Sequence, residues 1–308
     1  MFLEKDMYGK RRISADEKFL NYFSYGFIGL IALLCLVPFV MVVSGSLSSE
    51  EAVRSYGFDL FPRDFSMEAY KTVFQEPGVI GRAYAVTIIL TITGTCLGLF
   101  LQTMTAYVIA RKDFAWRNIF SFFFYFTMLF SGGLVPYYIL MTRYLGMRNN
   151  YLALLLPLIF NVYHLLIMKS YITSIPESFI HAAKIDGCGE FRTLVLIMMP
   201  MLKPAMVTIG LFIALAYWND WYSAMLFISR ENMHPLQYFL YNKVNNIEAY
   251  KRILESGAMA SSAAAAINMP TQTLKMALTV VVTGPIILLF PFVQKYYVRG
   301  ITIGGVKG

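Results

Sequence analysis

The 308-residue sequence is poor in charged residues, and this shortage bounds the class of protein. Asp, Glu, Lys and Arg make up only 14% of it, whereas soluble domains carry about 25%. Its hydrophobic content is 57% and its mean hydropathy is +0.57. This composition excludes an ordinary soluble domain, and we expect lipid to be most of the solvent around the chain.

Motifs for catalysis and ligand binding are also missing. The sequence has no GxxxxGK[ST] loop, so it should not bind ATP through a phosphate loop. It has no HExxH, no CxxC pair and no nucleophile elbow, and its three histidines are far apart in the expected topology. Cys35, Cys96 and Cys188 indicate neither a disulfide framework nor a metal site. We therefore predict no catalytic residue, no metal site and no cofactor bound by this chain.

The net charge of +8 is less informative than the composition. In a soluble protein it would suggest a nucleic-acid partner. Cytoplasmic loops of membrane proteins collect Lys and Arg, however, so we expect no nucleic acid here. The opening residues MFLEKDMYGKRRISADEK are too charged for a cleavable signal peptide, and the apolar run after them is long enough to span a bilayer.

Long apolar runs dominate what the sequence does contain. Crossing roughly 30 Å of hydrocarbon takes about 20 apolar residues. Six runs reach that length, which predicts an all-α membrane protein with six transmembrane helices. The second run contains Gly94 and Gly98, a GxxxG spacing that lets another helix approach closely. The runs are 20–44, 84–110, 118–140, 151–171, 204–228 and 274–293.

The distribution of Lys and Arg predicts the orientation of these spans. Of the 26 basic residues, fifteen lie in segments on the N-terminal side of the membrane and ten lie in the loops of the other side. The short loop ARKDFAWR is the kind on which the positive-inside rule works best. We therefore expect the termini, 1–19 and 294–308, to be cytoplasmic, together with a polar hairpin at 174–203. The long outside segment at 229–273 includes an Ala/Ser tract, 256–266, that fits either a helix or a loop.

The polar hairpin carries the strongest functional signal. Ser174 can cap a helix in which Pro176 lies in the first turn and Glu177 at the third position. Gly187 is predicted to end this helix in a left-handed conformation, after about eleven residues and roughly 17 Å. A second helix should return toward the membrane from about Glu190.

One face of the first hairpin helix suits contact with another protein. Small alanines on this face permit close approach, and an aromatic ring supplies an anchor for a groove on a partner. The alternative is an interfacial loop that only connects two spans. Four residues spaced at i, i+3, i+4 and i+7 make up the face: Phe179, Ala182, Ala183 and Asp186.

This hairpin resembles the EAA motif of ABC-importer permease subunits, E-A-A-x-x-x-G followed by an I-x-L-P block. Here the motif reads HAAKIDG at 181–187, and the block reads IMMP at 197–200. In that family the segment is the coupling helix, which lies in a cleft of the ATP-hydrolysing subunit. The resemblance implies that Glu177, His181 and Gly187 belong to this contact with the four face residues. His181 replaces the first Glu of the motif, and Glu177, one turn earlier, is a candidate to substitute for it.

Four further stretches look like permeases of the maltose and lipo-oligosaccharide class: PFVMVVSGSLSS, SGGLVPYY, NMPTQTLKMA and GPIILLFPFVQKYYVRGITIGGVKG. The resemblance implies a type I ABC-importer permease fold in a bacterial cytoplasmic membrane. The implied partners are the lipid bilayer, a second permease subunit, two ATP-binding subunits that bind ATP and Mg, and an extracytoplasmic solute-binding protein. It also implies that the Gly-rich tail at 300–308 reaches toward the ATPase dimer interface.

Polar groups within the fifth run mark a candidate solute pathway. Trp218, Asn219 and Asp220 lie in its outer half, where polar groups can bond sugar hydroxyls and aromatic rings can stack on sugar faces. The alternative is an interfacial aromatic belt. In the fourth run Asn161 and His164 share a face, and interhelical hydrogen bonding is favoured there over a role in the pathway.

The third run predicts an interrupted helix. Gly132 and Gly133 precede Pro136, and broken helices at membrane depth often line a pathway. Tyr137 and Tyr138 would then be pore aromatics, or equally residues of an aromatic belt.

Together these observations predict a translocation subunit of an ATP-driven importer of carbohydrate, oligosaccharide in particular, that works by alternating access. ATP hydrolysis would occur in partner subunits, so we do not expect this chain to be an enzyme. One alternative is an importer of the same class that carries peptides, polyamines or phosphate. Another is a secondary transporter driven by an ion gradient, which would need an acid or histidine relay near the midplane. Asp220, the only acid within a predicted span, lies off centre.

Overall fold

A computed structural model describes residues 15–255 and 271–304, and nearly all of them lie in helices or short connections. The expected all-α fold is confirmed: within these ranges no strand forms, and Ser48 and Phe65 make one isolated antiparallel bridge. The predictions for residues 1–14, for the tract 256–266 and for the tail end 305–308 fall outside the described residues. The chain divides into two compact units, which are taken in turn.

The described part of unit 1 comprises residues 15–73 and 271–280. Its first helix, α1 (Ala15–Ser46), covers the first predicted span and continues through Pro38. Most of its side chains are exposed, which suits a helix whose neighbour is lipid. Two short helices follow, α2 (Glu50–Tyr56) and α3 (Glu68–Val73). The Ser49 hydroxyl accepts the Ala52 N–H at 3.2 Å and so caps α2.

A carboxylate from α2 holds the start of the last helix, α16 (Gln272–Gly304), whose first residues belong to unit 1. The Glu50 carboxylate accepts backbone N–H groups of Gln272 at 3.1 Å and of Thr273 at 2.9 Å. It also accepts the hydroxyls of Thr271 and Thr273 at 3.1 and 2.8 Å. Because the first N–H groups of a helix have no partner inside it, Glu50 acts as a cap supplied from another element.

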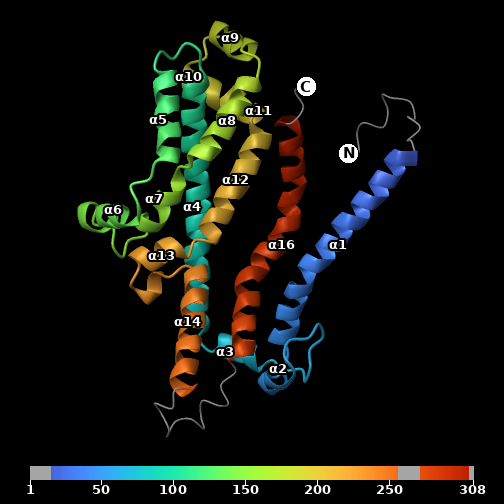
Figure 1. The fold of residues 1–308 in the computed structure, drawn as a ribbon. Helices are drawn as coiled ribbons and strands as arrows, with labels where there is room; N and C mark the ends of the chain where they lie inside the picture. The colour runs from blue at the N-terminus through green and yellow to red at the C-terminus, as the bar shows by residue number, and fades with distance from the viewer. Residues whose placement is uncertain (1–14, 256–270, 305–308) are drawn as a thin grey trace. The chain divides into compact units, whose positions relative to one another are not determined.

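Unit 2 is built around α4 (Pro77–Ala110), which runs unbroken for 34 residues. It packs against α7 (Leu152–Ile159), α8 (Val162–Ser174) and α12 (Lys203–Trp218), as Figure 1 shows. The other helices of unit 2 that lie wholly within the described residues are α5 (Arg117–Leu129), α6 (Leu134–Ile139), η1 (Leu140–Tyr144), α9 (Ser178–Ile185), α10 (Glu190–Arg192), η2 (Thr193–Met198), α11 (Met199–Met201), α13 (Tyr222–Phe227), η3 (Glu231–Met233) and α14 (Leu236–Glu255).

Two glycines of α4 allow its close packing. A Cβ at Gly94 would lie 2.2 Å from the ring of Tyr217 in α12. A Cβ at Gly98 would lie 2.9 Å from the backbone oxygen of Ile159 in α7. The close helix approach predicted from the GxxxG spacing is therefore present, and it involves two neighbours of α4.

Several predicted spans are broken helices. Among the described residues, two helices, Asp16–Ser46 and Pro77–Ala110, are long and apolar enough to cross a membrane, or up to five segments if each bent pair is one span. The third predicted run is bent by 109° between α5 and the segment Leu134–Tyr144, which comprises α6 and η1. The break falls at the predicted glycines, where Gly133 has a φ of +88°. The sixth run begins in the apolar helix Gln272–Leu288, and the total of six spans stays a prediction.

The fourth predicted run contains a 43° bend between α7 and α8. Asn161 lies at the break, where its side-chain oxygen accepts the N–H groups of Tyr163 and His164 at 2.9 and 3.3 Å and caps α8. The freed carbonyl of Ile159 accepts the buried amide of Gln102 at 3.2 Å. Side chains from neighbouring elements thus satisfy backbone groups that a continuous helix would pair internally.

Candidate functional site

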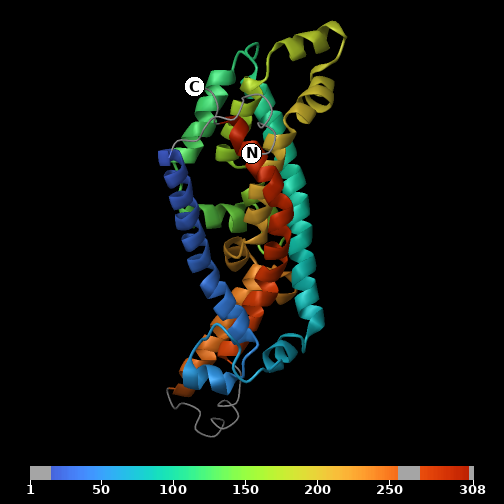
Figure 2. The ribbon, with the colours of Figure 1, turned by 90° about the vertical axis from the view of Figure 1, so that its right-hand side faces the viewer.

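The helix predicted to dock on a partner is α9, which projects beyond the end of α4 (Figure 2). It is eight residues long instead of about eleven. The prediction that Ser174 caps it is wrong, because Ser174 is the last residue of α8 and its hydroxyl donates to the Tyr171 carbonyl at 2.7 Å. Ile175 is extended, with ψ of 131°, as expected of a residue before proline, and this delays the start of α9.

The predicted end of α9 is confirmed. Gly187 adopts a φ of +75°, the left-handed conformation that glycine accepts without strain. Its N–H donates to the Lys184 carbonyl at 3.1 Å, and the Cys188 N–H donates to the Ala183 carbonyl at 2.9 Å. These two bonds form a Schellman motif, which closes the last turn of α9.

The four residues of the predicted docking face differ in exposure, and docking on a partner stays a prediction. Ala183 is buried and points toward the bundle, next to η2, whereas Ala182 and Asp186 are exposed. Phe179 is exposed as expected, but Ile185, at 87% exposure, is the larger apolar group offered to solvent. Ile185 lies three residues after Ala182 and therefore on the same side of the helix. A helical wheel centred on Ala182 identifies Ile185 as a member of the exposed face. The exposed face of α9 therefore comprises Phe179, Ala182, Ile185 and Asp186.

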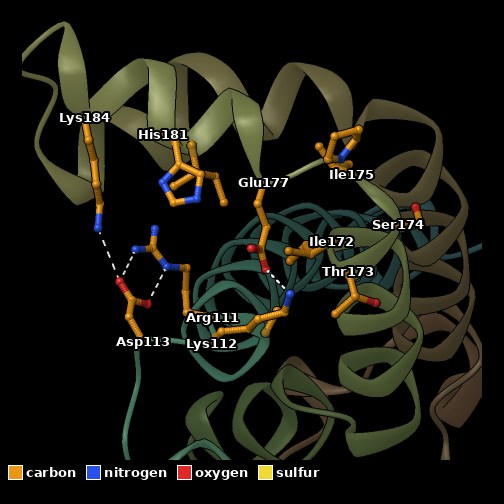
Figure 3. Close-up of a pocket in the computed structure, with 13 residues that line it drawn as sticks. Arg111, Lys112, Asp113, Ile172, Thr173, Ser174, Ile175, Glu177, His181 and Lys184 are labelled. Carbon is orange, nitrogen blue, oxygen red and sulfur yellow. Dashed lines mark hydrogen bonds and ion pairs between the residues drawn. The ribbon is translucent and has the colours of Figure 1, made fainter.

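The inner side of α9 faces a cavity of about 490 Å³ (Figure 3). Glu177, His181 and Lys184 line it from the hairpin, and the loop after α4, residues 111–113, lines it from the opposite side. Lys112 Nζ forms an ion pair with Glu177 Oε1 at 2.9 Å. Glu177 and His181, predicted as contacts to a partner, thus line the inner cavity, and Glu177 is already paired within the chain.

Arg111 joins the second set of charges at this end of the bundle. Its Nε donates to Asp113 Oδ1 at 2.8 Å, and a second guanidinium bond also reaches Asp113. Its Nη1 donates to Glu190 Oε2 at 3.0 Å and to the Tyr107 hydroxyl at 3.0 Å. Lys184 Nζ lies 3.3 Å from Asp113 Oδ2 and 3.2 Å from Glu190 Oε1. We call these five residues the Arg111 network.

The Arg111 network favours the charged forms of Arg111, Asp113 and Glu190. The Arg111 guanidinium, followed by Lys184, holds the pKa of Asp113 well below its usual value, and Asp113 in turn raises the pKa of Arg111. Burial raises the pKa of Glu190, but the hydrogen bonds from Tyr107 and Lys184 outweigh it, so that pKa is also lowered. Both carboxylates therefore remain ionised at neutral pH. Sequence reasoning missed this network, because its members lie up to 83 positions apart.

The residues predicted for a solute pathway lie around α13. Trp218 ends α12 as a buried side chain, and Asn219 is the exposed residue that follows. Asp220 Oδ1 accepts the Ser223 N–H at 3.0 Å and caps α13. This bond gives Asp220 a structural role, and its predicted contact with a solute stays a prediction.

The two tyrosines after the break in the third run also reach α13. The rings of Tyr137 and Tyr138 lie 5.8 and 6.0 Å from that of Phe227, the last residue of α13. Asp220 and this aromatic pair therefore meet the same short helix. Asn161 is different, since its side chain is used as the cap of α8. Its partner in the sequence argument, His164, stacks on Phe212 at 5.8 Å.

Within residues 15–255 and 271–304, no group of three or more His, Cys, Asp or Glu side chains could hold a metal ion. Cys35, Cys96 and Cys188 are free thiols. The α9 end of the bundle therefore presents a charged cluster beneath a small apolar face.

Comparison with known proteins places this arrangement in context. Residues 94–303 match the model of a family described as the binding-protein-dependent transport system inner membrane component. The chain is 37% identical to the polygalacturonan/rhamnogalacturonan transport system permease protein YtcP of Bacillus subtilis, over 92% of this chain and 96% of that one. It is 26% identical to the arabinooligosaccharides transport system permease protein AraQ of Halalkalibacterium halodurans, over 97% and 100%.

A solved structure is similar in fold as well as in sequence. It is the crystal structure of a bacterial ABC transporter involved in the import of the acidic polysaccharide alginate. The TM-score is 0.78, the sequence identity is 29%, and the match covers 92% of this chain and 98% of that chain.

Proposed function

The chain belongs to the family of binding-protein-dependent transport system inner membrane components, and from this premise we propose that it carries oligosaccharides into a bacterial cell. The resemblance drawn from the EAA motif is thereby confirmed, and so is the membrane-embedded importer fold that it implied. The substrate class is supported by the relatives, whose names refer to polygalacturonan, rhamnogalacturonan and arabino-oligosaccharides. It is also supported by the aromatic and polar groups near α13.

We propose that α9 is the coupling helix. The observation that carries this proposal is a short helix that projects from the bundle, offers Phe179 and Ile185 to solvent and ends at a left-handed glycine. An apolar anchor on a projecting helix suits a groove on another protein. The proposed partner of α9 is one of two ATP-binding subunits. These subunits would bind ATP and Mg, and this chain would bind no cofactor.

The proposed assembly also contains a second permease subunit and an extracytoplasmic solute-binding protein. Both termini of this chain, together with α9, would face the cytosol, as the Lys and Arg distribution predicts. Closure of the ATP-binding subunits would displace α9, and the helices of the bundle would rock to open the pathway near α13 to the outside. The chain would transmit force and line the pathway without forming or breaking a covalent bond.

The decisive experiment is uptake by the complete complex in proteoliposomes. We expect import of labelled oligogalacturonides or arabino-oligosaccharides when ATP and the loaded binding protein are present, and no import with a non-hydrolysable ATP analogue. Maltodextrins and peptides serve as comparison solutes. Uptake that needs an ion gradient and no ATP would contradict the proposal, and selective uptake of peptides would contradict the substrate class.

A substitution on the exposed face of α9 tests the coupling contact separately. Ile185→Asp places a charge in the proposed apolar contact, so we expect the ATP-binding subunits to dissociate during purification. Phe61→Asp is a matched control, because Phe61 is 82% exposed and belongs to unit 1. Retention of the ATP-binding subunits by the Ile185 variant would argue against α9 as their binding element.

A further inference from the structure

We propose that the loop at 111–113 is the positioning element of α9. The loop holds α9 at two points and passes the movement of α9 directly into α4. This inference rests on the proposed coupling role of α9. It assigns a function to Arg111, Lys112 and Asp113, which lie outside the EAA segment. The contacts, the exposure and the chain connections of the hairpin each support it.

Apolar packing holds α9 only weakly. Six of its eight side chains are exposed, Ile180 is half-buried, and Ala183 buries little more than a methyl group. Apolar stabilisation scales with the area removed from water, and this area is small here. Ile180 and Ala183 therefore fix the position of α9 on the bundle better than they fix the direction of its axis. A helix that receives a push needs a second kind of attachment to keep its orientation.

The loop supplies that attachment at both ends of α9. Glu177 and Lys184 are seven residues apart, which places them two turns and about 10.5 Å apart on one face. Lys112 pairs with Glu177 at 2.9 Å, and the next residue, Asp113, pairs with Lys184 at 3.3 Å. Figure 3 shows both pairs, with the loop beneath the helix. Two points of attachment along a rod fix its direction, which one point cannot do.

The loop is in turn fixed to α4. Arg111 directly follows α4, and its side chain is only 12% exposed. The guanidinium binds the hydroxyl of Tyr107, a side chain buried in the core of unit 2, and also Glu190 at the start of the returning helix. A planar guanidinium can hold several acceptors in fixed directions, which a lysine at this position could not do. Movement of α9 therefore has a short polar route into the central helix.

The covalent connections of α9 are a poorer route. Before α9 the chain passes through the extended residue Ile175, and after it the chain passes through Gly187 and Gly189. Glycine tolerates changes of φ and ψ at little cost, so a connection containing two glycines transmits direction poorly. The ion pairs of the loop bypass these connections.

A charge swap tests the proposal, because Lys112 and Glu177 form an ion pair with each other. In the complete complex, Lys112→Glu and Glu177→Lys should each lower the ratio of sugar imported to ATP hydrolysed about five-fold or more. The double variant should return to within about two-fold of the unsubstituted complex. Arg63→Glu is the matched control, since it breaks a similarly exposed pair with Asp59 in unit 1, and it should leave the ratio unchanged.

The outcomes separate the alternatives. If Glu177→Lys alone lowers the ratio and the double variant does not recover, Glu177 contacts the ATP-binding subunit itself and the proposal is overturned. Unchanged ratios in both single variants would overturn it as well. Failure of the proposed function looks different, since the unsubstituted complex would then show no ATP-dependent uptake. Co-purification of the ATP-binding subunits checks that every variant assembles.

A covalent tether gives an independent test. Lys112→Cys and Glu177→Cys, combined with Ser at the three native cysteine positions, can be joined by a short bifunctional thiol reagent. If the loop and α9 move as one body, the tethered complex should import sugar at the rate of the untethered one. Import that stops on tethering and returns when a cleavable reagent is cut would show that the two segments separate during transport, which overturns the proposal.

Discussion

Two helices in this chain are held by charged side chains from other elements, and the two holds differ in kind. At the start of α16, the nearly buried carboxylate of Glu50 accepts backbone N–H groups and threonine hydroxyls. At α9, the attachments are ion pairs between side chains, and the carboxylates of Asp113 and Glu190 remain more than half exposed. One hold satisfies a helix terminus, and the other sets the direction of a helix.

The difference follows from what water can replace. If Glu50 is removed, the N–H groups at the start of α16 lose partners in a site with little access to water, which carries the full cost of unpaired donors. If an exposed pair at α9 is broken, both charges regain hydration, and the cost to stability is small. The first hold should therefore matter for folding, and the second for transmitting force.

The largest expected effect on stability comes from Glu50→Ala. Loss of a charged cap with several hydrogen bonds should lower the free energy of unfolding by about 2 kcal/mol, or the midpoint temperature by about 5 °C. Thermal unfolding in detergent measures it. Glu51→Ala, at an exposed neighbour, should change the midpoint by no more than about 1–2 °C. Equal midpoints for the two variants would remove the distinction drawn between the two holds.

A second prediction concerns the glycine that ends α9. Gly187→Val forces a β-branched residue into a φ of +75° and should cost about 1–2 kcal/mol locally, which would shift the end of α9 and uncouple ATP hydrolysis from uptake. Gly189→Val is the control, since its φ is −70° and a Cβ there meets nothing within 4 Å. Wild-type coupling in an assembled Gly187→Val complex would count against the role of this turn.

Asp220 provides a third helix start for comparison. Asp220→Ala removes the cap of α13 and should lower stability by about 1 kcal/mol and weaken uptake. Asp220→Asn keeps an acceptor for the Ser223 N–H but removes the charge. Uptake that recovers in the Asn variant indicates a structural cap, whereas uptake lost in both indicates that the carboxylate acts in the pathway. Initial uptake rates at several sugar concentrations distinguish these cases.

The smallest expected effect is the dependence of stability on acid. The pKa of Glu50 is raised by burial but lowered more by the bonds from Thr273 and Gln272, so it lies below the value of 4.5 expected for the unfolded chain. Its stabilisation should therefore be complete above about pH 4.5 and decline as the pH falls through the folded pKa. The difference in midpoint between the unsubstituted protein and Glu50→Ala should shrink in that range. A constant difference down to pH 3 would contradict the shift.

Local rules predicted much of the fold from the sequence. The interruption at Gly132 and Gly133, the left-handed turn at Gly187 and the returning helix from Glu190 all follow from residue types within a few positions. Ser174 failed as a cap because Pro176 holds the preceding residue in an extended conformation, an effect that competes with capping.

Long-range partners were not predictable in the same way. Arg111 and Glu190 are 79 positions apart, and Glu50 and Thr273 are 223 apart. Nothing in either local sequence specifies the other member. The inward position of Ala183 was missed for a related reason, because the half-buried Ile180 and the pairs made by Glu177 and Lys184 decide how α9 is rotated.

The bend in the fourth predicted run is accommodated by residues at distant positions in the sequence. Room for the carbonyl of Ile159 depends on Gly98, its hydrogen bond depends on Gln102, and the Tyr217 hydroxyl donates to the Leu155 carbonyl at 2.6 Å. A relative whose fourth run forms one straight helix would have no need of this combination. Reading positions 98, 102 and 217 together should therefore sort bent from straight homologues before any of their structures is determined.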